Sequence, residues 1–211
     1  MRVVDPKAHQ RRIWCIERAA LRLIAAHGYA ETSLEQVAEA CRMRKASLYH
    51  YFDSKEALLH GIIEAMVRKM HAQVLNMRGE MLDMRERGRS LEGSLYQIGM
   101  KVLENMSLAE NRNFTRILER DAGTNSYIRR VFFKVANRTM GGAEKTLLTP
   151  GLWKGRRISA REHLMHMHQY MGCMFRYAVE TRLWKSGPAM GFGDRNYVRS
   201  LARIFAKGIR A

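Results

Sequence analysis

The side chains with the clearest binding chemistry in this chain are basic, hydroxyl-bearing and aromatic, and they gather between residues 32 and 55. Hydroxyl, ammonium and guanidinium groups are the donors that hold phosphate oxygens, and an arginine fork also matches the edge of a guanine base. The pattern therefore predicts a surface that binds a polyanion. The candidate contacts are Thr32, Ser33, Arg42, Arg44, Lys45, Ser47, Tyr49, His50, Tyr51 and Lys55.

Residues with the spacing of a catalytic or metal site are not found elsewhere in the sequence. There is no Ser-His-Asp order, no paired-carboxylate site and no phosphate-binding glycine loop. His163, His166 and His168 crowd one expected helix start, and His163 and His166 share a face, but only Glu162 stands near enough to join them. We expect no enzyme activity, no metal and no cofactor.

Composition and charge favour a helical protein with an anionic partner. The 211 residues are 46% hydrophobic and include only three prolines, which leaves long stretches free to be helical. The net charge of +17 favours nucleic acid or an anionic membrane surface, and a merely basic surface is the simpler alternative. Residues 1–60 carry only +3 of this charge and residues 61–211 carry +14, so most of it lies outside the candidate contacts.

The cysteines and the apolar runs indicate a cytoplasmic protein. Cys15, Cys41 and Cys173 show no paired spacing, and such a sparse, odd set suits a reducing compartment. The N-terminus has no apolar signal core, and no apolar run reaches the ~18 residues of a membrane span. We expect a soluble, cytoplasmic chain with no membrane partner.

The elements that must position the candidate contacts can be placed from capping signals and helical periodicity. Asp5-Pro6 opens a helix over residues 6–27, and Thr32 or Ser33 can cap a short second helix. Another short helix follows it and ends near Phe52. Asp53 and Glu56 then stand in capping-box spacing at the start of a long helix, and we expect Gly79 to weaken the end of that helix. Further helices are predicted over residues 90–109, 111–121, 124–147, 159–185 and 194–209.

Two short helices after a longer one form a helix-turn-helix, whose second short helix can lie in the DNA major groove. The chain resembles the N-terminal DNA-binding domain of the TetR family over roughly residues 10–62. The matching pieces are His27-Gly28-Tyr29, Thr32-Ser33, Val37-Ala38-Glu39-Ala40, Lys45 through Phe52, and Ser54-Lys55-Glu56-Ala57-Leu58. The resemblance implies an all-α protein with a three-helix DNA-binding domain over residues 1–58 and a helical effector-binding and dimerisation domain over residues 59–211.

The turn departs from the family pattern. Arg42-Met43-Arg44 stands where the family usually has a glycine, an apolar residue and a small hydroxyl residue. If Arg42 must adopt a positive φ, the strain costs roughly 1 kcal/mol, and losing the hydroxyl cap at Arg44 costs about another 1 kcal/mol. We predict that Arg44 contacts a base or phosphate, and a solvated arginine is the alternative. Leu48 and Phe52 are expected in the core, while Lys55 resembles the family's phosphate-binding lysine.

For the C-terminal part, the resemblance implies a ligand pocket among the middle helices and a dimer interface in the last two. The pocket candidates are Met66, Met70, Phe114, Leu118, Phe133 and Tyr170. The dimer-interface candidates are Met167, Met171, Met174, Phe175, Tyr197, Leu201, Ile204 and Phe205. A methionine-rich core is the plainer interpretation of the same residues, since methionine fills gaps in cores as well as in adaptable sites.

The sequence therefore predicts a DNA-binding transcription regulator that pairs as a homodimer on a palindromic operator in double-stranded DNA. The family's common mode implies a repressor that a small hydrophobic or amphipathic ligand releases. The cationic excess, including Arg129-Arg130 and Lys154-Gly155-Arg156-Arg157, permits an acyl-CoA, although a solvated surface explains it as well. The alternative is a dimeric DNA-binding regulator without a small-molecule effector, controlled by a protein partner or by abundance.

Overall fold

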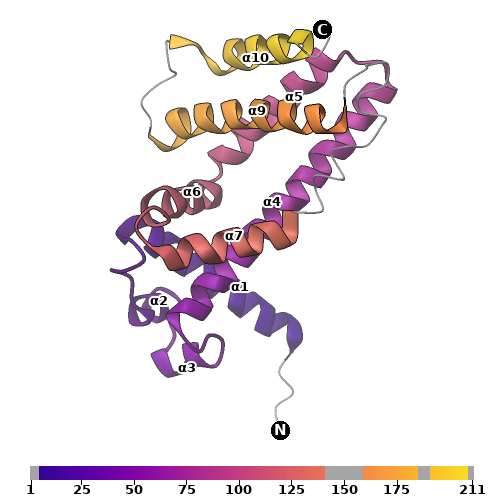
Figure 1. Cartoon of the computed structure of the whole chain (residues 1–211). Helices are drawn as coiled ribbons and strands as arrows, with labels where there is room; N and C mark the ends of the chain where they lie inside the picture. The colour runs from indigo at the N-terminus through magenta and orange to yellow at the C-terminus, as the bar shows by residue number, and fades with distance from the viewer. Residues whose placement is uncertain (1–4, 141–158, 185–190, 209–211) are drawn as a thin grey trace. The chain divides into compact units, whose positions relative to one another are not determined.

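The computed structural model describes residues 5–140, 159–184 and 191–208, and its regular structure there is helical (Figure 1). The helices are α1 (Pro6–His27), α2 (Leu34–Ala40), α3 (Lys45–Tyr49), α4 (Lys55–Glu86), α5 (Leu91–Ser107), α6 (Ala109–Asp121), α7 (Ser126–Met140), α9 (Ala160–Ala178), the π-helical turn η2 (Val179–Leu183) and α10 (Asp194–Gly208). None of these helices is long and apolar enough to cross a membrane. The all-α prediction is confirmed.

The helix starts follow the capping signals of the sequence. The Asp5 carboxylate accepts a hydrogen bond from the backbone N–H of Lys7 at 3.0 Å, and α1 has the predicted bounds. Of the two candidate caps for α2, Ser33 is the one used: its hydroxyl accepts from the N–H of Gln36, whose side chain accepts from the N–H of Ser33. Thr32 has a different role, described below.

Two details of α4 correct the sequence interpretation. Its first turn is capped by Ser54, whose hydroxyl accepts from the N–H of Ala57 at 3.0 Å, and not by Asp53. The helix also does not end near Gly79, where we expected it to be weakened, but continues to Glu86. A single glycine costs about 1 kcal/mol relative to alanine, and the strong helix formers on both sides of Gly79 offset that penalty.

The other predicted helices are found at nearly the predicted positions. Residues 141–147 of the helix predicted over 124–147 lie outside the described residues, as do residue 185 of the helix 159–185 and residue 209 of the helix 194–209. The prediction of domains at 1–58 and 59–211 stays a prediction. By packing alone, the chain divides into two compact units, each of which takes residues from two separate parts of the sequence.

The first unit contains the residues up to Arg68 together with Ala109–Asn137, so α6 and α7 pack with α1, α2, α3 and the start of α4. Its core includes Ile16, Ile24, Val37, Leu48, Leu58, Leu59, Ile62, Ile63 and Ile117, each at most 2% exposed. Arg120 of α6 donates from its guanidinium group to the carbonyl oxygens of Ile24 and Ala25 in the last turn of α1. Basic groups stabilise the carbonyl end of a helix, so Arg120 adds to the local cap of α1, in which the N–H of Gly28 donates to the carbonyl of Ile24 at 2.8 Å.

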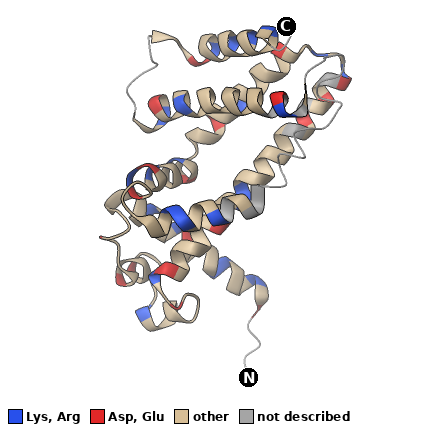
Figure 2. Cartoon of the chain, viewed as in Figure 1, with Lys and Arg blue, Asp and Glu red and all other residues tan. Residues whose placement is uncertain are grey.

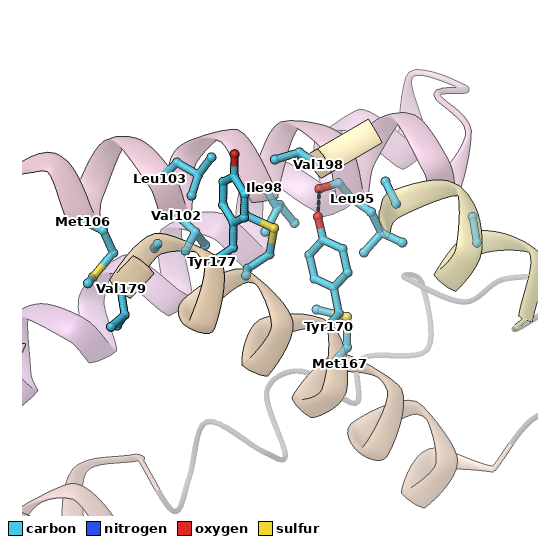
Figure 3. Packing of buried hydrophobic residues seen from close by; sticks show 14 of the residues in the cluster. Leu95, Ile98, Val102, Leu103, Met106, Met167, Tyr170, Tyr177, Val179 and Val198 are labelled. Atoms are coloured by element: carbon cyan, nitrogen blue, oxygen red, sulfur yellow. Dashed lines mark hydrogen bonds between the residues drawn. The ribbon is translucent and has the colours of Figure 1, made fainter. Parts of the chain in front are cut away.

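The second unit contains Lys69–Leu108 and the described residues from Arg138 onward, and α5 packs against both α9 and α10 (Figures 1 and 3). Tyr170 is fully buried there, and its hydroxyl donates to the carbonyl oxygen of Leu95 at 2.6 Å (Figure 3). The helices meet closely at Gly99, where an added Cβ would lie 2.5 Å from Cγ1 of Val198 and 2.6 Å from the Tyr170 hydroxyl. Any larger residue at this crossing would force the side chain of Val198 or Tyr170 to shift.

Candidate nucleic-acid interface

The turn between α2 and α3 is a Schellman motif, which ends α2 and starts the new helix. The N–H of Met43 donates to the carbonyl of Ala38 at 3.0 Å, and the N–H of Arg42 donates to the carbonyl of Glu39 at 2.9 Å. This pair of bonds requires a left-handed residue between them. Arg42 takes that position, with φ of 52°, and is the one described residue other than glycine with a positive φ.

The strain anticipated at Arg42 is therefore present, and so is the missing cap at Arg44. Arg44 occupies the N-cap position of α3 without a side-chain capping bond. The side chains of Arg42 and Arg44 are both exposed, and neither has an acidic partner among the described residues. Two uncommitted guanidinium groups thus flank the start of α3.

Lys45, the first residue of α3, is paired with Glu35 of α2. The hydrogen bond between them is the main reason why the pKa of the Lys45 ammonium is raised and that of the Glu35 carboxyl is lowered. The ammonium also lies 5.9 Å from the ring centre of Tyr49, which is 42% exposed. Because the pair is in solvent, a phosphate can replace Glu35 as the partner of Lys45.

Lys55 opens α4 and is held over the preceding loop. Its ammonium donates to the carbonyl of Ala30 at 3.1 Å and lies 4.4 Å from the ring centre of Tyr29. The Tyr29 hydroxyl donates to Glu56 at 3.1 Å, and the Tyr29 pKa is raised, mainly by burial and then by this carboxylate. Lys55 is thus fixed in position beside the helix-turn-helix.

The remaining candidate contacts differ in their exposure. Thr32 is 3% exposed and its hydroxyl donates to the carbonyl of Gly28 at 2.8 Å, so its role is to close the loop rather than to meet a phosphate. Ser33 and Ser47 are half-buried, and the Ser33 hydroxyl is used in the capping box. His50 is exposed, whereas Tyr51 is half-buried.

Tyr51 connects the end of the motif to α1. Its ring stacks on His9 with 5.0 Å between ring centres, and His9 is exposed. Leu48 is fully buried and Phe52 is 9% exposed, which confirms that these two residues pin the motif to the core. The Glu35 pair and the His9 stack were not anticipated, because both join residues on different helices and leave no periodic signal in the sequence.

Positive charge is not confined to the helix-turn-helix. Lys and Arg recur along α1 and along α10 (Figure 2). Within the described side chains, no group of three or more His, Cys, Asp or Glu comes together to hold a metal. His166 is half-buried and His168 is exposed, while the side chain of His163 lies outside the described residues, as does the Lys154-Gly155-Arg156-Arg157 cluster.

The pocket candidates are divided between the two units. Met66, Phe114, Leu118 and Phe133 belong to the first unit, and Met70 and Tyr170 belong to the second. Met66 and Phe114 are buried, Met70 and Leu118 are half-buried, and Phe133 is 55% exposed. Tyr170 is already committed to the core of its own unit through its bond to Leu95. A pocket formed by all six residues stays a prediction.

The dimer-interface candidates fall into two groups. Met167, Met171, Met174, Tyr197, Leu201 and Phe205 lie in the core of the second unit or pack against it. In that unit the Tyr197 ring stacks on Tyr177 at 3.9 Å, and Phe205 meets the edge of Tyr170 at 5.5 Å. Phe175 and Ile204, by contrast, are 46% and 62% exposed. Of the eight candidates, these two therefore have side chains exposed enough in a single subunit to contact a second subunit.

The helix-turn-helix and the fold can be compared with known proteins. The family model for bacterial regulatory proteins of the tetR family matches residues 16–62. An uncharacterized HTH-type transcriptional regulator of Bacillus subtilis, YuxN, is 38% identical over 63 residues, which are 30% of this chain. The matched region spans 22% of the length of that relative.

Solved structures with the same fold cover nearly the whole chain. GusR of Salmonella enterica aligns with a TM-score of 0.62 and 18% identity, covering 98% of this chain and 100% of that one. FadR of Bacillus subtilis, solved in complex with stearoyl-CoA, aligns with a TM-score of 0.59 and 16% identity, covering 92% of this chain and 98% of that one. The reduced form of NemR of E. coli aligns with a TM-score of 0.62 and 14% identity, covering 95% of this chain and 98% of that one. The helix-turn-helix is thus similar in sequence to the tetR family of bacterial regulatory proteins over residues 16–62, and the solved structures share the all-helical fold over nearly the whole chain.

Proposed function

We propose that the protein is a sequence-specific DNA-binding transcription regulator whose helix α3 enters the major groove. The observation that carries the proposal is the pair of exposed guanidinium groups, Arg42 and Arg44, that flank the start of α3 without an acidic partner among the described residues. Lys45, Tyr49 and His50 continue the same surface. In this role Arg44 reads a base edge or holds a phosphate, and Arg42 and Lys45 hold phosphates.

One α3 of five residues reads too few base pairs for useful specificity, so the proposal includes a homodimer that reads two half-sites. Phe175 of α9 and Ile204 of α10 are the exposed apolar side chains proposed for the contact between subunits. Two such helices from each subunit would form a four-helix interface around a two-fold axis. The size of the particle in solution, measured by light scattering, tests this part.

Selection of bound fragments from fragmented genomic DNA, followed by footprinting, tests the central proposal. A palindromic site is expected, with half-sites about one helical turn apart. Arg44→Ala should weaken binding to that site by roughly 1–3 kcal/mol, or leave a salt dependence shallower by about one unit. The matched control is Arg195→Ala, which removes an exposed arginine from α10. Equal affinities and equal salt slopes for Arg44→Ala and the unaltered protein would refute the assignment.

We further propose that a small hydrophobic or amphipathic ligand releases the protein from DNA. The fold shared with FadR of Bacillus subtilis, crystallised with stearoyl-CoA, supports an acyl-CoA as the first probe. A ligand shifts the equilibrium only by its difference in affinity for the free and DNA-bound states, so it must bind the free form more tightly. Stearoyl-CoA should raise the melting temperature of the free protein and lower its affinity for the footprinted site. Failure of a broad panel of amphiphiles to do either would favour a regulator without a small-molecule effector.

A further inference from the structure

Two of the three cysteines meet beside the turn of the helix-turn-helix, although 26 positions separate them in the sequence. The thiol of Cys41 lies 3.8 Å from the carbonyl oxygen of Cys15. Cys15 is exposed on α1, and Cys41 is half-buried at the C-cap of α2. The third cysteine, Cys173, is exposed in the second unit and takes no part in this contact.

The two thiols differ in their environments, and this difference gives them different reactivities. Burial raises the pKa of the Cys41 thiol, and the neighbouring Cys15 raises it further, whereas Arg12 and Arg22 act in the opposite direction. Cys41 is therefore a weak nucleophile towards a dissolved reagent. Cys15 is open to solvent on the same helix as both arginines, so a reagent in solution reaches it first.

We propose that Cys15 and Cys41 form a redox-sensitive thiol pair, which hydroperoxides oxidise to a disulfide that lowers the affinity of the protein for DNA. The oxidation rests on the contact between the two cysteines. Its effect on DNA binding rests in addition on the proposed function.

The reaction takes two balanced steps. The Cys15 thiolate attacks the terminal oxygen of the hydroperoxide and breaks the O–O bond, giving a sulfenic acid and an alcohol, or water when the reagent is hydrogen peroxide. The Cys41 sulfur then attacks the Cys15 sulfur, the S–S bond forms, and the hydroxyl leaves as water with the proton of the Cys41 thiol. Two thiols lose two electrons in total, and one hydroperoxide accepts them.

The disulfide would act on DNA binding through the turn. Cys41 donates its backbone N–H to the carbonyl of Val37 at 3.1 Å and directly precedes Arg42, the left-handed residue of the Schellman motif. A disulfide holds the two Cα atoms about 4.4–6.8 Å apart with a fixed dihedral angle, so it ties the end of α2 to α1. Movement of Cys41 into that geometry displaces Arg42 and Arg44, the two guanidinium groups proposed to contact DNA.

Peptide mapping of the full-length protein tests the oxidation without reference to DNA. With Cys173→Ser as the background, treatment with one equivalent of hydrogen peroxide should consume both remaining thiols. Trypsin should then release residues 13–18 joined to residues 23–42, a species that a reducing agent splits. The further variants Cys15→Ser and Cys41→Ser should yield no such species. Two intact thiols after treatment, or a disulfide only between different molecules, would overturn the proposal.

DNA affinity tests the consequence separately. On the footprinted site, oxidised Cys173→Ser protein should bind at least about tenfold more weakly than reduced protein, the equivalent of losing one base contact. Dithiothreitol should restore the affinity, and peroxide should leave the affinities of the Cys15→Ser and Cys41→Ser variants unchanged. A disulfide with unaltered DNA affinity would refute the regulatory role. If the reduced protein binds no DNA, the proposed function fails, while peptide mapping still decides whether the thiol pair forms a disulfide.

Discussion

The left-handed backbone at Arg42 allows the strain in the turn to be separated from the charge of the side chain. At φ of 52° a residue with a Cβ is strained by about 1–2 kcal/mol, whereas glycine is not. Glycine loses more backbone entropy on folding, which offsets about 0.5–1 kcal/mol of that gain. Arg42→Gly should therefore have a free energy of unfolding roughly 1 kcal/mol above that of Arg42→Ala, which keeps the strain but removes the same guanidinium group.

Urea denaturation of the two variants, followed by circular dichroism with the same m-value imposed, measures this difference. The free energy of unfolding of Arg42→Ala should be close to that of the unaltered protein, because the Arg42 side chain is exposed and has no ionic partner in the described structure. Both variants should lose DNA affinity by the same factor, with a salt slope reduced by about one unit. A glycine variant no more stable than the alanine variant would refute the assignment of strain to this residue. Unequal losses of affinity would show that the turn, and not the charge, governs the contact with DNA.

Three further perturbations have expected outcomes. Glu35→Gln should raise DNA affinity several-fold more than Glu39→Gln, measured by fluorescence anisotropy, because it frees Lys45 as well as removing a negative charge; equal effects would contradict a role for the pair. Gly99→Ala should lower the free energy of unfolding by about 1–3 kcal/mol in urea titration, and an unchanged midpoint would show that the helices separate easily there. The pKa of Glu56 is lowered by its own backbone N–H and then by the Tyr29 hydroxyl, so its stabilising effect is present above the ordinary value of 4.5 and is lost as the pH falls through the folded-state pKa. The difference in unfolding free energy between the unaltered protein and Glu56→Gln should shrink between about pH 6 and about pH 3, and a difference independent of pH would refute it.

Much of the fold could be predicted from the sequence because its signals are local. The bounds of α1 follow from Asp5, Pro6 and Gly28, and the capping box of Ser33 and Gln36 marks the start of α2. The positive φ of Arg42 is a conditional expectation, drawn from the glycine that the resembled family usually has at this position, and the structure confirms it.

The contacts that shape the site could not be predicted in the same way. The Lys45–Glu35 pair, the His9–Tyr51 stack and the cap that Arg120 gives to α1 each join residues whose separation in sequence has no helical period. Thr32 shows the complementary difficulty. Its hydroxyl suits a phosphate by type, but only the folded loop reveals that the hydroxyl is turned inward to Gly28.

The contact of Arg120 with the end of α1 has a consequence for folding during synthesis and for truncation of the protein. Besides the local bond from Gly28, the carbonyls at the end of α1 accept hydrogen bonds from Arg120, about a hundred positions later, and the first unit is complete only when Asn137 has been added. At roughly 5–20 residues per second, the N-terminal segment leaves the ribosome several seconds before α6 exists. A fragment that stops after the helix-turn-helix would lack α6 and α7 of its own unit, so we expect a stable fragment of the first unit to require both stretches of the chain.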